Sequence, residues 1–131
     1  MWPKTLIVLA LLVLSTTPAF AQGPRRLTPL VVDGERYFRL QWEAADQNGS
    51  PRIQGSIFND YGFAARKIRL LIDSLDASGG VTAQTLAYLP LDLTPGTQMY
   101  FDAKVPARAD SYRVSVFEWE WIQAGSGGDP R

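Results

Sequence analysis

Short runs of apolar or alternating residues, separated by turn signals, fill the chain between Arg52 and Trp121 and constrain its fold more than any other feature. The turn signals contain glycine, proline, asparagine or aspartate, and they fall at residues 59–62, 76–80 and 93–96. Strand-length runs at such regular spacing are typical of antiparallel sandwiches. The sequence therefore predicts an all-β chain that forms a single antiparallel β-sandwich of about seven strands.

The alternation of apolar and polar residues predicts which side chains face the core. A period of two indicates a half-buried strand, because successive side chains point to opposite faces. The residues predicted to share the core-facing side of their strands are Phe38, Leu40, Trp42, Ile53, Gly55, Ile57, Ile68, Leu70, Ile72, Tyr112, Val114 and Val116. A short first strand is expected at 30–32, before the turn-prone pair Asp33-Gly34, and a loop is expected at 46–51.

Three further segments carry specific expectations. Residues 66–75 also fit a helix, because Leu71 and Leu75 are four positions apart, but the flanking turns favour a strand. The strand expected at 81–89 meets Pro90, which restricts it to a sheet edge or ends it early. Residues 93–96 combine proline and glycine in the order that suits a type II turn.

The first 21 residues have the features of a signal peptide. Lys4 gives a positive start, residues 6–14 form an unbroken apolar run, and Ala19-Phe20-Ala21 fits the small-x-small cleavage rule. The apolar run is about half the length of a membrane-spanning helix, which needs roughly 20 residues. A retained amino-terminal anchor is the alternative interpretation. We expect cleavage after Ala21 and a periplasmic or secreted mature chain without a membrane span.

The remaining residues divide into three parts. Residues 22–35 are predicted to form a leader with the short first strand, 36–122 the sandwich domain, and 123–131 a disordered glycine-rich tail. The roughly 110 residues left after cleavage suffice for one hydrophobic core. Because the chain has no cysteine, its stability is expected to come from packing and hydrogen bonds without disulfides.

The charge of the mature chain is predicted to lie close to zero. Removing Lys4 leaves twelve basic side chains against thirteen acidic ones. A surface so nearly balanced offers no electrostatic attraction for nucleic acid or for an anionic membrane. We therefore expect the partner to be a protein or another envelope ligand, and not a nucleic acid.

Several short motifs follow one another in a fixed order along residues 52–121. They are Gly55-x-Ile57-x-Asn59, Ile68-x-Leu70-x-Ile72, Leu75-Asp76-x-x-Gly79, Leu93-x-Pro95-Gly96, Phe101, Val105-Pro106 and Tyr112-Arg113-Val114-Ser115-Val116. The ordered set resembles the FxLYD-type immunoglobulin-like domains of exported bacterial proteins. That family has a tyrosine-aspartate-like pair before the glycine turn, whereas this chain has Leu75-Asp76. The resemblance implies an immunoglobulin-like β-sandwich in the envelope or outside the cell, and it carries over no enzymatic activity.

The sequence contains no histidine and no cysteine, which excludes most catalytic and metal-binding chemistry. Serine and cysteine nucleophiles usually need histidine as their base. Zinc sites draw mainly on cysteine and histidine. We therefore predict a protein that is not an enzyme and that uses no cofactor and no metal.

Acidic residues leave two minor alternatives. Glu118 and Glu120 are two positions apart, so on a strand they point to one side, roughly 6–7 Å apart. This spacing is compatible with a carboxylate-based hydrolase, although two exposed carboxylates are the simpler interpretation. Asn59-Asp60, Asp73 and Asp76 offer oxygen ligands for calcium. The simpler interpretation is that Asn59 and Asp76 hydrogen-bond the local backbone and fix their turns.

Three aromatic residues of the last strand, Phe117, Trp119 and Trp121, form the candidate interaction face. The alternation that turns Val114 and Val116 toward the core places these rings on the opposite side. An exposed aromatic strip of this kind binds sugars, peptides or proteins. The alternative is that the leader at 27–32, or a bulge, covers or redirects the rings.

These observations together predict a non-catalytic exported interaction module that recognises a partner or ligand by the surface of its sandwich. An alternative from another class is a structural envelope or assembly component that pairs through a sheet edge.

Overall fold

The computed structural model describes residues 26–123. The predicted signal peptide (1–21), the first leader residues (22–25) and all but the first residue of the predicted tail (123–131) lie outside the described residues. The described part contains one turn of 3-10 helix and six strands: η1 (Gly34–Arg36), β1 (Phe38–Gln47), β2 (Ser50–Asn59), β3 (Ala64–Leu75), β4 (Val81–Tyr88), β5 (Gln98–Lys104) and β6 (Ser111–Ile122). Within it, no helix is long and apolar enough to span a membrane.

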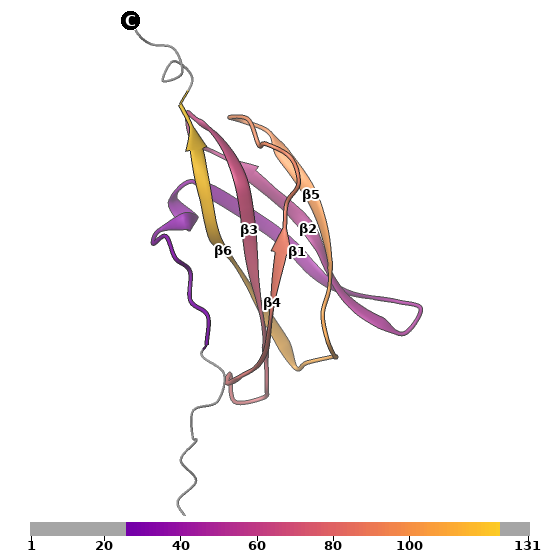
Figure 1. Ribbon diagram of the computed structural model, residues 1–131. Coiled ribbons are helices and arrows are strands. Elements are labelled where there is room, and N and C mark those ends of the chain that lie inside the picture. Colours follow the sequence, from indigo (N-terminus) through magenta and orange to yellow (C-terminus); the bar gives the residue numbers. More distant parts are fainter. Residues whose placement is uncertain (1–25, 124–131) are drawn as a thin grey trace, which may run out of the picture.

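The strands form two antiparallel sheets of three strands, which confirms the predicted all-β sandwich. One sheet has the order β1-β2-β5 and the other the order β4-β3-β6, and the two lie face to face (Figure 1). The strand β4 is an edge strand and ends at Tyr88, in agreement with the restriction expected from Pro90. The strands β1 and β6 are also edge strands, and each belongs to a different sheet.

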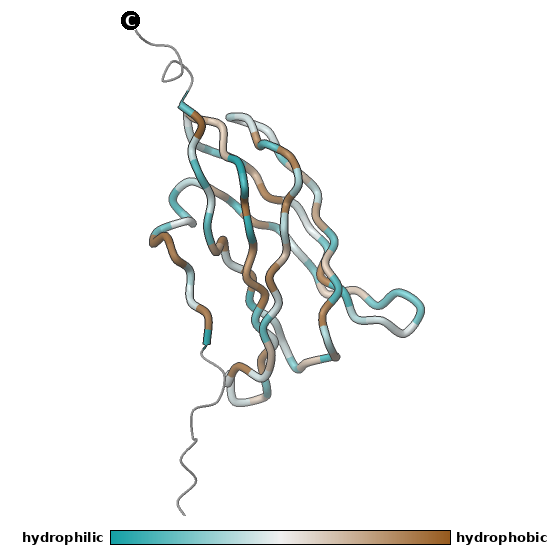
Figure 2. Tube along the Cα trace, in the orientation of Figure 1, coloured by the Kyte–Doolittle hydropathy of each residue, from teal (hydrophilic) through white to brown (hydrophobic). Residues whose placement is uncertain are grey.

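The core lies between the two sheets and uses the faces that the alternation predicts. The inward residues of the two central strands are fully buried: Ile53 and Ile57 from β2, and Ile68, Leu70 and Ile72 from β3. Phe38 is also buried, whereas Leu40, Trp42 and Val114 are only partly buried against the core. Figure 2 shows hydrophobic residues along the middle of β3 and, separately, along the leader that runs beside the sandwich.

Two tight turns set the ends of the strands. The loop expected at 46–51 is shorter than predicted, because only Asn48 and Gly49 lie between β1 and β2. Both have positive φ, 55° and 80°, which is the geometry of a two-residue type I′ hairpin. At 93–96 the predicted type II turn is confirmed: Thr97 N donates to Thr94 O at 3.2 Å, and Gly96 has a φ of 74°.

The leader does not form the short first strand expected at 30–32, so the sandwich has six strands and not about seven. Its only backbone–backbone hydrogen bond to a strand, among the residues described, runs from Leu30 N to Phe117 O at 2.8 Å. The preceding Pro29 has no N–H to extend a ladder. Asp33 then adopts a left-handed conformation (φ 65°) and turns the chain into η1.

Candidate functional site

Phe117, Trp119 and Trp121 do not form the exposed strip that the alternation suggested. Phe117 is 4% exposed and Trp119 is 8% exposed, and Trp121 is half-buried. The structure therefore corresponds to the alternative in which the rings are covered or redirected. The expectation that these three rings are exposed is wrong, because they are largely packed against other parts of the fold.

Two irregularities between β3 and β6 explain the change of side. The register runs from Arg66 opposite Glu120 to Arg69 opposite Glu118 and then to Leu70 opposite Val116. Between the first two pairs, β3 advances by three residues and β6 by only two, so β3 contains one unpaired extra residue; Lys67 in this stretch has a positive φ of 53°. Between the second and third pairs, β6 advances by two residues and β3 by one, so Phe117 is the extra residue in β6. One extra residue reverses the alternation of everything after it.

After the bulge, Trp119 points to the same side as Val116 and enters the core. Its ring lies 5.0 Å from the ring of Phe38, centroid to centroid, in an edge-to-face contact. Gly34 of η1 packs against it so closely that a Cβ there would lie 3.4 Å from the Trp119 ring. Trp121 stacks on Phe38 at 5.5 Å. Both tryptophans therefore belong to the packing of this end of the sandwich.

The acidic residues considered for catalysis are all engaged in ion pairs with β3. Glu118 pairs with Arg69, and Glu120 pairs with Arg66 at 3.1 Å and with Lys67 at 3.8 Å. These contacts place a cation beside each carboxylate. Neither glutamate lines the cavity between β1 and β6 that is described below.

The residues considered for calcium are used in turns and in one buried network. The amide of Asn59 donates to Phe63 O at 2.9 Å and to Leu93 O at 3.0 Å, and its Oδ1 accepts from Tyr61 N. Asp76 Oδ1 accepts from Ser78 and Gly80, and the Ser78 hydroxyl, followed by Gly80 N–H, lowers the pKa of this carboxyl. Within residues 26–123 no group of three acidic side chains is arranged to hold a metal ion.

The leader crosses the outer face of the β4-β3-β6 sheet and is attached there by side chains. Gln84 of β4 accepts from Leu27 N and donates to Leu27 O, both at 2.9 Å. Gln84 also donates to Asp73, a residue that is 3% exposed and whose carboxylate accepts two hydrogen bonds from Arg113. The buried acid thus connects the leader, β3, β4 and β6 in one network.

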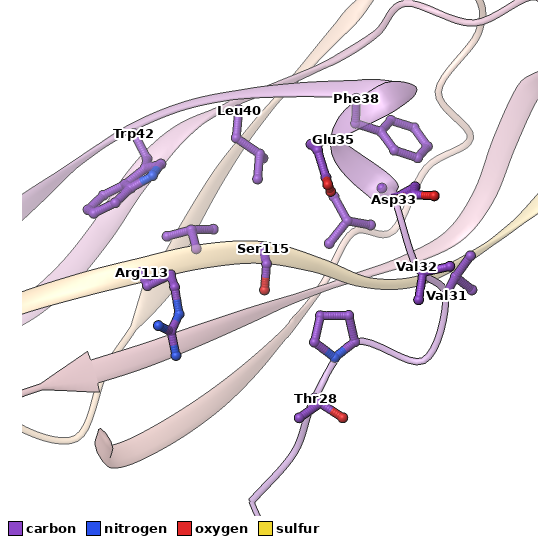
Figure 3. A pocket seen from close by; sticks show the side chains of 14 residues that line it. Thr28, Val31, Val32, Asp33, Glu35, Phe38, Leu40, Trp42, Arg113 and Ser115 are labelled. Atoms are coloured by element: carbon purple, nitrogen blue, oxygen red, sulfur yellow. The ribbon is translucent and has the colours of Figure 1, made fainter. Parts of the chain in front are cut away.

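A cavity of about 810 Å³ lies between the edge strands β1 and β6 and is flanked by the leader. Its lining comprises Thr28, Pro29, Val31, Val32, Asp33, Gly34, Glu35, Phe38, Leu40, Trp42, Arg113, Val114, Ser115 and Val116. Figure 3 shows Leu40 and Trp42 extending from β1 toward β6 and the ring of Phe38 turned sideways at the end of the cleft, while Arg113 and Ser115 point to the other side of β6. We call this cavity the β1/β6 cleft.

The cleft opens the interior of the sandwich on one side. Inward residues of the central strands, such as Ile53 and Leu70, have no exposed surface. Their counterparts on the edge strands, including Leu40 and Val114, keep part of their surface accessible. The sequence identified these residues as core, but it did not reveal the cleft, because alternation does not say which strands lie at sheet edges.

The charged residues of the cleft gather at its ends. Asp33 and Glu35 lie beside Phe38, at the end where the leader meets β6 (Figure 3). Asp33 Oδ2 lies 4.0 Å from Arg36 Nη1, and Glu35 has no ion-pair partner among residues 26–123. Arg113 lies toward the opposite end, where its guanidinium is held by Asp73. One end of the cleft therefore carries two acidic side chains, and the other end carries Arg113 in its ion pair with Asp73.

The fold and the cleft define a small β-sandwich with an opening between two sheet edges. Comparison with known proteins found no matching family model, no similar curated protein and no similar solved structure.

Proposed function

We propose that this protein is a non-catalytic, exported interaction module and that its binding site is the β1/β6 cleft. The observation that carries the proposal is the cleft itself: core side chains of β1 and β6 line a cavity of about 810 Å³ between two sheet edges. Concave, mostly apolar sites with a few polar groups at the rim are typical of binding sites, and their volumes reach about 1,000 Å³. The expected export of the chain and its resemblance to FxLYD-type domains are consistent with this proposal.

The chemistry of the lining supports binding rather than catalysis. The ionisable groups of the cleft are the exposed carboxylates of Asp33 and Glu35 and the guanidinium of Arg113, which is held by Asp73. The chain has no histidine to act beside them as a base near neutral pH. Glu118 and Glu120, the candidates for a carboxylate mechanism, pair with basic residues of β3 instead. The apolar side chains of the cleft offer an occupant surface to bury, which favours binding.

The alternative role as an assembly component is supported by a separate observation. Both β1 and β6 are edge strands, and an unpaired edge is a template for pairing with another chain. In this role the partner would be a structural subunit, and the same cleft would receive it. The two roles therefore predict the same binding site.

A photo-crosslinking experiment tests the proposed site. A benzophenone amino acid replaces Leu40 in the cleft or, as the control, Tyr88, which is 68% exposed on the outer face of β4. We expect crosslinks to a discrete partner in the envelope of the producing cell from position 40 and not from position 88. Equal crosslinking from both positions, or none from position 40 in a folded variant, would contradict the proposal.

A further inference from the structure

We infer that the β1/β6 cleft receives one extended segment of a partner chain, which lies as an added strand antiparallel to β6. The inference rests on the proposed function and specifies what occupies the site. Addition of a strand to an open sheet edge uses backbone hydrogen bonds for affinity and side-chain pockets for selectivity.

The backbone of β6 provides the first argument. One edge of β6 pairs with β3 along the strand. On the other edge, among residues 26–123, the only backbone hydrogen bond is the one that Phe117 O accepts from Leu30 N. The stretch 113–116 lines the cleft, and no strand of the described part of the chain pairs with it on that edge. Its outward N–H and C=O groups match the spacing of an extended chain and not that of a helix or a small molecule.

The side chains of the cleft provide the second argument. Phe38, Leu40 and Trp42 line the cleft from alternate positions of β1 and so span two strand repeats, about 13 Å, with Phe38 closing one end as a buried residue. A strand beside β6 would place alternate side chains in this space, and about three of them would fit the length. The occupant should therefore carry three apolar side chains separated by single residues.

The charges at the ends of the cleft provide the third argument. A strand antiparallel to the free stretch of β6 begins beside Val116, next to the site taken by Leu30, and ends near Arg113. Its amino-terminal end would then lie beside Asp33 and Glu35, and Glu35 has no ion-pair partner among the described residues. The occupant should therefore carry a lysine or arginine just before its apolar alternation.

The printed sequence after Gln123 does not have this chemistry. Residues 124–131 read AGSGGDPR, with no alternating apolar side chains and no basic residue ahead of any. A segment of a partner chain fits the requirements, and pairing between two copies through β6 is a distinguishable outcome.

A synthetic peptide tests the inference on the mature chain. The probe has one lysine followed by three valines separated by threonines, and its binding is measured by calorimetry and by amide hydrogen exchange of β6. We expect binding, with slower exchange within 113–116. A peptide of the same composition with its valines contiguous should bind at least about tenfold more weakly, as expected from the loss of one or two side-chain contacts.

Backbone methylation separates strand pairing from simple apolar contact. One peptide carries N-methyl groups on the valines and another on the threonines, so in one of them the amides that face β6 are blocked. We expect one methylated peptide to lose at least about tenfold in affinity, because each backbone hydrogen bond removed costs roughly that factor. Equal binding of both methylated peptides and the parent would overturn strand pairing.

Two variants locate the site and test its polarity. Val114→Arg should abolish binding by filling the cleft, whereas the matched control Leu86→Arg, on the outer face of β4, should not. If Val114→Arg does not fold, the substitution Glu35→Lys at an exposed position serves instead. It should lower the affinity for the peptide that begins with lysine and raise the affinity for a peptide that begins with glutamate. Unchanged binding in both Glu35→Lys titrations would overturn the proposed direction of the strand.

The remaining outcomes distinguish this inference from the proposed function. Crosslinking from position 40 without binding of any alternating peptide would overturn the strand and leave the cleft as a binding site. Concentration-dependent dimers with protected amides at 113–116 in the absence of peptide would identify a second copy as the occupant and overturn the partner segment. Loss of both crosslinking and peptide binding would overturn the two proposals together.

Discussion

Gln84 binds the backbone of Leu27 with both ends of its side-chain amide. Gln84 Nε2 donates to Leu27 O at 2.9 Å, and Leu27 N donates to Gln84 Oε1 at 2.9 Å. The same Nε2 also donates to the buried carboxylate of Asp73. The leader is thus held to the sheet by a side chain at Leu27 and by one backbone hydrogen bond at Leu30, which explains how it stays in place beside the β1/β6 cleft.

We expect Gln84→Leu to release the leader. The substitution removes both hydrogen bonds to Leu27 and one to Asp73, and each is worth about 0.5–1.5 kcal/mol at most. The free energy of unfolding should fall by about 1–2 kcal/mol, and amide exchange at residues 27–30 should become faster. Urea denaturation and hydrogen exchange measure the two effects.

Gln41→Leu is the matched control for this prediction. Gln41 is exposed on β1 and makes no side-chain hydrogen bond within the described part of the chain. Its substitution should leave the leader exchange unchanged. Slow exchange of Leu27 in the Gln84 variant would show that the leader is held by other contacts.

The strand faces were predictable wherever alternation continues without interruption. The predicted inward positions are buried where the strand keeps its period of two, as at Phe38 on β1, Ile53 on β2 and Leu70 on β3. The type II turn at 93–96 was predictable for a similar reason, because proline and glycine restrict φ locally. These features depend on neighbours in sequence, and sequence patterns report them directly.

The candidate site was not predictable, because it depends on contacts between distant strands. The bulge at Phe117 exists only relative to β3, and no local signal marks the point where Trp119 changes sides. The cleft depends on β1 and β6 being edges of different sheets. If a further strand paired with the free edge of β6, Val114 would be buried, although the sequence around it would show the same alternation.

Replacing Gly55 with alanine should destabilise the protein, because the backbone of β1 lies very close to Gly55. A Cβ at Gly55 would lie 2.7 Å from the Cα of Trp42 and closer still to Gln41 O. Backbone atoms cannot move aside as the end of a flexible side chain does. We expect Gly55→Ala to cost about 1–3 kcal/mol, as overpacking does in well-packed interiors.

The control for Gly55 is Gly62→Ala. Gly62 lies in an exposed turn, and an added Cβ there meets nothing within 4 Å. Denaturant midpoints should therefore separate the two alanine variants clearly. Equal midpoints would mean that β1 and β2 can move apart at Trp42 without cost.

Trp119 should contribute more to stability than Trp121. Trp119 is 8% exposed and packs on Phe38 and Gly34, so Trp119→Ala should cost about 3–5 kcal/mol. Trp121 is half-buried and should cost less. Tyr100→Ala, at a position 61% exposed, is the control and should change stability by no more than about 0.5 kcal/mol. Thermal denaturation that left the Trp119 variant unchanged would restore the aromatic strip as a surface feature.

Asp76 should contribute to the loss of stability in acid. Hydrogen bonds from the Ser78 hydroxyl and from Gly80 N–H favour its charged form and lower its pKa in the folded state. A group whose pKa is lower when folded stabilises the protein above its unfolded pKa, about 3.9 for aspartate, and the contribution disappears as the pH falls through the folded value.

Asp76→Asn isolates this effect, because the substitution retains an oxygen at Oδ1, the atom that accepts all three hydrogen bonds. We expect the variant to be less stable than the parent at pH 7 and the two to converge below about pH 4, near the unfolded pKa of aspartate. Urea titrations between these conditions measure the difference. Asp92→Asn, at an exposed position without an ion pair or hydrogen bond in the described chain, should show no convergence. A constant gap between Asp76→Asn and the parent at every pH would place the effect in packing of the turn and not in the charge of the carboxylate.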